Sequence, residues 1–179
     1  MQTGKVLAYL AAMIDLKSYI RNVPDFPQPG ILFRDISPLL REAFGATIEA
    51  LSALLDEREW SQVDAVAGVE SRGFILASAL ALRHDKGFVL IRKKGKLPPP
   101  VVDLAYGLEY GQGVLEMQAG SGRLLLVDDV LATGGTLTAS AALAELAGYS
   151  VFQSIVLLDL RLNPPFRWGR PPVRAALHY

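Results

Sequence analysis

The strongest constraint on the fold is the segment at residues 123–136, RLLLVDDVLATGGT, where an apolar run leads into two acids and a loop of small residues. Residues 124–127 are apolar without alternation, as expected of a parallel strand covered on both faces. Asp128 and Asp129 fall where this strand should end, and residues 137–147 have the composition of a helix. In open parallel sheets, ligands bind beyond the carboxyl ends of the strands. The segment therefore predicts an α/β fold with a ligand site at that edge of the sheet.

The loop within this segment suits an anion. Unpaired N–H groups and a favourable dipole at a helix N-terminus attract phosphate, whereas the two acids repel it and should face sugar hydroxyls or a hydrated cation. A phosphorylated sugar satisfies both requirements, because its phosphate suits the loop and its hydroxyls suit the two acids. A ligand-free turn beside a solvated acidic strand end is the alternative, and neither a Walker A lysine nor a GxGxxG fingerprint is present. The predicted phosphate loop consists of Ala132, Thr133, Gly134, Gly135 and Thr136.

This segment resembles the phosphoribosyl-pyrophosphate signature of the type I phosphoribosyltransferases: four apolar residues, two acids, two apolar residues and ATGGT. The resemblance implies that Asp128 and Asp129 bind the ribose hydroxyls. It also implies that the loop at residues 132–136 binds the 5-phosphate.

A proline-rich stretch, residues 23–40, carries an unusual load of aromatic and charged residues. Its prolines and Gly30 argue against regular structure, so a plain connector is one interpretation. An aromatic ring that stacks on a heterocycle is the other. The stretch resembles the FPxPG(I/V)xFRDI segment of the adenine phosphoribosyltransferases. This resemblance implies that Phe33 stacks on adenine, that backbone groups of Leu32 and Arg34 read the edge of the base, and that Val130 covers its other face.

A second strand–turn–helix pattern supplies a candidate for phosphate binding. Residues 63–69 indicate a buried strand and residues 74–83 a helix, with Glu70-Ser71-Arg72-Gly73 between them. Arg72 could pair bidentately with a phosphate, or it could form a surface ion pair. ESRGF resembles the pyrophosphate-binding turn of the same family. That resemblance assigns Ser71 and Arg72 to pyrophosphate, gives Arg72 a catalytic role, and implies a cis peptide bond between Glu70 and Ser71.

The densest basic cluster, residues 92–96, follows a predicted strand at residues 87–92 and precedes three prolines that should be extended. Such a cluster can be a solvated face or a nucleic-acid patch, and a mobile loop closing over a polyanion is the third interpretation. RKxGKLP resembles the family's sequence at this position. The resemblance implies that Arg92, Lys93 and Lys96 bind pyrophosphate, partly from the neighbouring subunit of a homodimer, and that a loop at about residues 93–109 covers the site.

The segment LEYG supplies the candidate for proton transfer. A purine that attacks through ring nitrogen 9 must lose a proton, and the Glu109 carboxylate could accept it. An exposed glutamate in a hairpin is the alternative. The resemblance makes Glu109 a proton-transfer residue and places Tyr110 in the closing loop.

The rest of the sequence indicates the number of domains and the expected cellular setting, but it assigns no residue a function. The chain of 179 residues fits one domain, and its net charge of +0 gives no argument for nucleic acid or membrane. Having no cysteine suits a reducing cytoplasm. An apolar run at residues 6–14 is broken by Asp15 and Lys17 without a cleavage site, so we expect no signal peptide and no membrane span. Further predicted elements are helices at residues 4–21 and 44–58, a strand at 151–158, a loop at 161–172 and an edge strand at 173–179.

Together these patterns predict a single α/β domain, residues 1–179, with the type I phosphoribosyltransferase fold: a mostly parallel central sheet flanked by helices, a hood at residues 22–36 and a flexible closing loop. The resemblance implies conversion of adenine and phosphoribosyl pyrophosphate to AMP and pyrophosphate. It also implies Mg²⁺, held mainly by substrate oxygens and water. The alternatives are a phosphoribosyltransferase for a 6-oxopurine and a regulator that senses phosphoribosyl pyrophosphate.

Overall fold

A computed structural model describes residues 14–108, 111–162 and 171–179. Contacts between Cα atoms divide the chain into two compact units, Met1–Ala53 and Leu54–Tyr179.

The first unit contains a short hairpin and small helices. Strands β1 (Arg21–Pro24) and β2 (Leu32–Asp35) pair antiparallel, with Val23 opposite Phe33. The connecting loop contains Asp25 and Gly30 at positive φ, and the Asp25 carboxylate accepts the Gly30 N–H at 2.7 Å. The other elements are η1 (Leu16–Tyr19), α2 (Ser37–Glu42) and α3 (Phe44–Ser52).

Two expectations for this unit are wrong. The predicted helix at residues 4–21 does not continue to its end, because Leu16–Tyr19 is a 3-10 helix and Arg21 begins β1; residues 4–13 lie outside the described residues. Residues 23–40 are also more regular than expected. Pro24 ends β1, where a missing N–H is tolerated, and Pro38 lies in the first turn of α2, so neither proline prevents pairing or helix formation.

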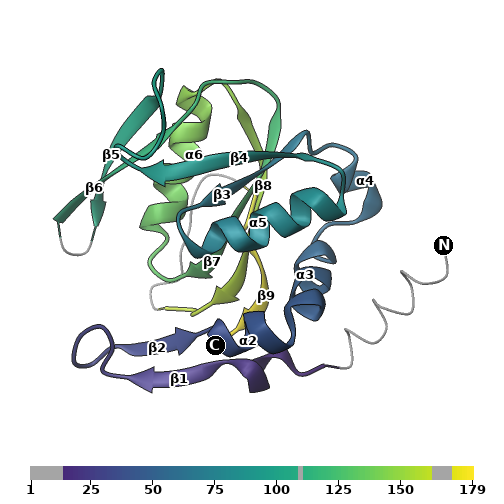
Figure 1. Ribbon diagram of the computed structural model, residues 1–179, viewed down its shortest axis with the longest axis vertical. Helices are drawn as coiled ribbons and strands as arrows, with labels where there is room; N and C mark the ends of the chain where they lie inside the picture. Colours follow the sequence, from purple (N-terminus) through teal and green to yellow (C-terminus); the bar gives the residue numbers. More distant parts are fainter. Residues whose placement is uncertain (1–13, 109–110, 163–170) are drawn as a thin grey trace. The chain divides into compact units, whose positions relative to one another are not determined.

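The second unit is built on a sheet of seven strands in the order β5-β6-β4-β3-β7-β8-β9 (Figure 1). Neighbouring strands from β4 to β9 pair parallel, whereas β6 pairs antiparallel with both β4 and β5. This confirms the mostly parallel central sheet. The strands are β3 (Ala65–Val69), β4 (Gly87–Lys93), β5 (Val102–Leu108), β6 (Gly111–Met117), β7 (Arg123–Leu131), β8 (Ser150–Asp159) and β9 (Arg174–His178).

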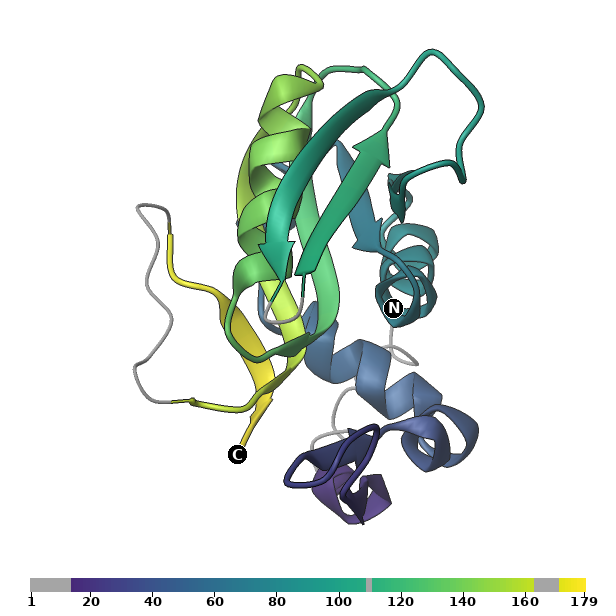
Figure 2. The same cartoon turned by 90° about the vertical axis from the view of Figure 1, so that its left-hand side faces the viewer.

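Two long helices cover opposite faces of this sheet. Helix α5 (Arg72–Arg83) contacts β3 and β7, and helix α6 (Gly135–Leu146) contacts β5, β6 and β8. Figure 2 shows the blue-teal α5 and the green α6 on either side of the strands. Residues 124–127 are fully buried, because their side chains alternate between two covered faces. Because both faces of β7 are covered, apolar and polar residues do not alternate at residues 124–127.

Three boundaries in this part of the chain differ from expectation. The predicted helix at residues 44–58 ends at Ser52, and a short helix, α4 (Glu57–Trp60), begins after Asp56. Asp56 and Glu59 form a capping box that requires extended backbone at Asp56, so a continuous helix is excluded. Residues 102–108 form strand β5 rather than loop. Strand β7 continues to Leu131, so the paired acids lie within the strand instead of at its end.

His84 predicts a pH dependence of stability. Its ring stacks on Trp60 with centroids 3.5 Å apart, and burial, followed by the charges of Arg83 and Lys86, lowers its pKa to about 4. A histidine that stays neutral in the folded state stabilises above its unfolded pKa of about 6.5, and this stabilisation is lost as the pH falls towards 4. We expect the wild type to lose about 1 kcal/mol more unfolding free energy between pH 7 and pH 5 than His84→Phe, a value reduced for partial exposure.

Denaturant unfolding of both proteins at pH 7 and pH 5 measures this difference. Phenylalanine keeps a ring stacked on Trp60 but cannot titrate. A difference in pH dependence between the two proteins therefore reports the imidazole and not a change in packing. An equal pH dependence in the two proteins would contradict the assignment.

Candidate active site

The paired acids of β7 form the centre of the candidate site. Asp128 and Asp129 are 8% and 7% exposed, and the Asp129 N–H donates to Asp128 Oδ1 at 2.9 Å. Arg72, the first residue of α5, brings Nε within 2.8 Å of Asp129 Oδ2. The structure therefore joins two predicted site segments, residues 70–73 and 128–136, that are far apart in sequence.

Burial dominates the electrostatics of this pair. It raises the pKa of Asp128 well above its ordinary value, and the neighbouring Asp129 carboxylate adds to the rise. Burial also raises the pKa of Asp129, although the Arg72 guanidinium opposes the rise. Two acids held this way favour a ligand that donates hydrogen bonds, such as a diol, over an anion.

Gly73 makes this approach possible. A Cβ atom at residue 73 would lie 3.0 Å from the Val127 carbonyl oxygen and 3.1 Å from Asp128 Oδ1. A side chain at residue 73 would therefore require the start of α5 and β7 to move apart by a few tenths of an ångström. Sequence patterns alone assign Gly73 no role; its place in the turn after a buried strand is the signal that could have identified it.

The loop after β7 leads directly into helix α6. Gly134 is the N-cap residue and has φ +83°, a left-handed conformation that glycine adopts without strain. Since glycine has no side-chain oxygen, it leaves the first-turn N–H groups of α6 without a side-chain cap. Gly135 and Thr133 are exposed. The predicted phosphate loop thus presents backbone donors at a helix N-terminus.

The end of β4 reaches the turn that precedes α5. Arg92 contacts the Glu70 carboxylate, with Nε–Oε2 at 3.2 Å, and the Lys93 N–H donates to the same oxygen at 3.0 Å. Although burial acts to raise the pKa of Glu70, these hydrogen bonds lower it on balance. The Glu70–Ser71 peptide bond is cis, as the resemblance implied. Glu70 is a second residue whose role sequence patterns alone do not reveal.

The residues predicted for base binding lie in both units. Phe33 on β2 meets the Phe26 ring edge-on, with centroids 5.1 Å apart, and Leu32 is 48% exposed. Leu32 and Arg34 are two residues apart on a strand, so their backbone groups face the same edge. Val130 lies half-buried near the end of β7 in the second unit. Glu109 and Tyr110 lie outside the described residues.

Elsewhere in the described residues, metal ligands, membrane-spanning helices and pockets give no second candidate for this site. In residues 14–108, 111–162 and 171–179, no group of three His, Cys, Asp or Glu side chains is arranged to hold a metal ion. No helix in the same residues is long and apolar enough to cross a membrane. A pocket of about 200 Å³ contains none of the predicted site residues; it is lined by Phe88, Val89, Leu90, Leu97, Gln118, Ala119 and Tyr149.

Comparison with known proteins gives one consistent result. Residues 37–164 match the phosphoribosyl transferase domain. The adenine phosphoribosyltransferase of Hydrogenovibrio crunogenus is 52% identical over 165 residues, covering 92% of this chain and 96% of that protein. The crystal structure of the Rhodothermus marinus adenine phosphoribosyltransferase superposes with a TM-score of 0.78 and 40% identity, covering 98% and 99% of the two chains. The Saccharomyces cerevisiae enzyme, solved with an imino-altritol bisphosphate and adenine, superposes with a TM-score of 0.80 and 32% identity, covering 97% and 99%.

Proposed function

The chain belongs to the phosphoribosyl transferase family and, within it, to the adenine phosphoribosyltransferases, and from this premise we propose how its residues carry out the transfer. The reaction is one of purine salvage: adenine and phosphoribosyl pyrophosphate give AMP and pyrophosphate. The contact between Arg72 and Asp129 carries the proposal. Arg72 is a candidate for binding the leaving pyrophosphate, and it lies beside Asp129, a candidate for binding the ribose hydroxyls. We treat residues 1–179 as a single catalytic domain.

The sugar donor is proposed to lie along the carboxyl edge of β7. Asp128 and Asp129 accept hydrogen bonds from the two ribose hydroxyls, and their negative charge favours the positive charge that develops on the ring as the C1–O bond breaks. The 5-phosphate is bound by the N–H groups and hydroxyls of residues 132–136. The open first turn of α6 after Gly134 supports this assignment.

The leaving pyrophosphate is proposed to face the basic residues at the ends of β3 and β4. Arg72 and Ser71 come from the turn, and Arg92, Lys93 and Lys96 come from the strand end and the loop that follows. The side chains of Lys93 and Lys96 are exposed, which supports a role in binding a polyanion from solvent. Their charge stabilises the pyrophosphate as the C1–O electron pair moves to its oxygen.

Adenine is proposed to stack on Phe33 and Val130, with its edge held by backbone groups of Leu32 and Arg34. Ring nitrogen 9 attacks the anomeric carbon from the face opposite to the leaving group and then loses a proton. Glu109 accepts that proton, and Tyr110 belongs to the segment that closes over the site. Because strand β2 has only β1 as a neighbour in the described sheet, one of its edges remains for a ligand, which supports the base site.

Magnesium is proposed as the cofactor. We expect the ion to be held mainly by substrate oxygens and water, because magnesium keeps several of its waters when it binds. When bound, the ion neutralises charge on the pyrophosphate.

A homodimer is also proposed. Ile75 and Leu82 lie seven residues apart on the same side of α5, and they are 42% and 86% exposed; Phe88 at the start of β4 is 38% exposed. Exposed apolar side chains of this size support a subunit interface, which light scattering would test. From the cysteine-free sequence we propose a cytoplasmic location, which cell fractionation would test.

An AMP-formation assay tests the function. We expect product from adenine and phosphoribosyl pyrophosphate, and at least about 100-fold lower kcat/KM with hypoxanthine or guanine, since a site that hydrogen-bonds one purine edge leaves groups unpaired with another. A preference for 6-oxopurines would reject adenine as the substrate. Binding of phosphoribosyl pyrophosphate without turnover of any purine would favour a regulator.

A further inference from the structure

A buried carboxylate on β6 holds the basic loop that follows β4. Glu116 is 3% exposed and accepts three backbone hydrogen bonds: from the N–H of Gly95 at 2.9 Å, of Lys96 at 2.6 Å and of Leu97 at 2.7 Å. Successive N–H groups that converge in this way form a concave anion site. Here the anion belongs to the protein itself, so the loop wraps around a fixed point on the sheet.

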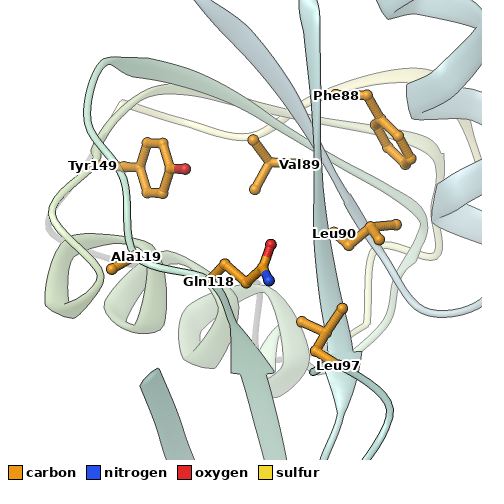
Figure 3. Close-up of a pocket in the computed structure, with 7 residues that line it drawn as sticks. All are labelled: Phe88, Val89, Leu90, Leu97, Gln118, Ala119 and Tyr149. Carbon is orange, nitrogen blue, oxygen red and sulfur yellow. The ribbon is translucent and has the colours of Figure 1, made fainter. Parts of the chain in front are cut away.

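The backbone of the loop is shaped for this contact. Gly95 has φ +81°, which turns the chain so that consecutive N–H groups face the same carboxylate. The N–H of Lys94 donates to the Val114 carbonyl at 3.0 Å, which ties the beginning of the loop to β6. At the other end, Leu97 lines the pocket shown in Figure 3 together with Leu90 and Gln118. The segment at residues 94–97 is therefore fixed at both ends and in the middle.

A chain of contacts connects this segment to the proposed leaving-group site. The Lys96 carbonyl accepts a hydrogen bond from Arg92 Nη1 at 3.1 Å. The same guanidinium pairs with Glu70, which immediately precedes Ser71 and Arg72. If the Glu116 carboxylate were removed, the Lys96 carbonyl would no longer be held within reach of Arg92. The side chains of Arg92 and Lys96 would then no longer be fixed relative to each other.

We propose that Glu116 is a positioning residue for pyrophosphate recognition, which acts by fixing residues 95–97 so that Arg92 and Lys96 present their charges together. The proposal rests on the proposed function. Glu116 touches no reacting atom in this scheme, and it differs from the direct pyrophosphate residues because its carboxylate would repel the ligand. The Gly95 N–H, followed by those of Leu97 and Lys96, lowers the pKa of Glu116 despite its burial, so it remains ionised at neutral pH.

The test compares Glu116→Gln and Glu116→Ala with Asp103→Asn. Asp103 lies opposite Glu116 on β5 and pairs with the Lys94 side chain at 3.4 Å, so it is a nearby carboxylate that contacts the loop only through an exposed ion pair. We expect Glu116→Gln to raise KM for phosphoribosyl pyrophosphate at least about 10-fold, because three charge-assisted hydrogen bonds are weakened. KM for adenine should change less than about threefold, and Asp103→Asn should leave both values within about twofold.

Hydrogen exchange provides a readout that does not depend on catalysis. The amides of Gly95, Lys96 and Leu97 should exchange at least about 10-fold faster in Glu116→Gln than in the wild type, while amides of β3 and β7 keep their rates. Unchanged exchange at residues 95–97, or an equal rise in both KM values, would overturn the proposal. If the wild type formed no AMP, the proposed function would fail, and calorimetric titration with inorganic pyrophosphate would replace KM as the test of Glu116. Equal pyrophosphate affinity in wild type and Glu116→Gln would then overturn it.

Discussion

Replacing Asp128 by asparagine is expected to lower kcat/KM by about 100-fold or more while making the protein more stable. The loss of activity follows from removing a charged acceptor of a ribose hydroxyl, since hydrogen bonds to charged groups contribute about 1.5–3 kcal/mol. The gain in stability follows from burial, which raises the pKa of Asp128. A carboxyl group with a raised folded pKa stabilises below its unfolded pKa, and that contribution is lost as the pH rises, so at neutral pH the amide should be preferred.

Thermal unfolding at pH 7.5 and steady-state kinetics measure the two effects together. We expect a melting temperature higher by about 2–4 °C, which corresponds to about 1 kcal/mol for a chain of this length. Asp129→Asn is the matched control, because it should lower activity similarly but also break the ion pair with Arg72. A less stable Asp128→Asn protein, or one with wild-type kcat/KM, would contradict the assignment.

Phe33→Ala is expected to raise KM for adenine by about 10- to 100-fold, because stacking of a base on an aromatic ring contributes about 1–3 kcal/mol. KM for phosphoribosyl pyrophosphate should change less than about threefold, since the sugar donor is assigned to residues of the second unit. Initial rates with each substrate varied in turn separate the two constants.

Phe33→Tyr is the control for this change, because it keeps the ring and should retain KM for adenine within about threefold. Phe26→Ala provides a second comparison, since Phe26 is 50% exposed and makes a T-shaped contact with the Phe33 ring. An equal loss for both substrates in Phe33→Ala would reject the base-site assignment.

The parts of the fold that sequence predicts well are those in which local pattern and burial agree. Strands β3, β7 and β8 are largely buried apolar runs, and β4 is an apolar run whose first residues are exposed. The observed bounds of all four strands lie within two residues of the predicted ones, except at the carboxyl end of β7. The contact between the turn at residues 70–73 and the paired acids follows from parallel topology, because the acids on β7 lie level with the carboxyl end of the adjacent β3, where the turn begins.

The features that sequence does not predict depend on contacts between distant residues. Glu116 lies between the buried Leu115 and Met117 on β6, and nothing in its own segment of sequence indicates that its carboxylate accepts the N–H groups of residues 95–97. Gly73 is one of 16 glycines, and its importance comes from the Val127 carbonyl 54 positions away. The break between α3 and α4 was missed because apolar spacing continues through a capping box.

Helix α5 is held at both of its ends. Gly73 seats its first turn against β7, and His84 stacks on Trp60 just after its last residue. A helix of 12 residues secured in this way has little freedom to tilt or slide, so Arg72 is a stationary charge whose orientation is set before any substrate arrives. Lys93 and Lys96 have exposed side chains, which can change orientation as the product leaves even though the backbone of Lys96 is held by Glu116. We therefore expect Arg72 to keep its orientation through the reaction, whereas the exposed lysine side chains adjust to the pyrophosphate.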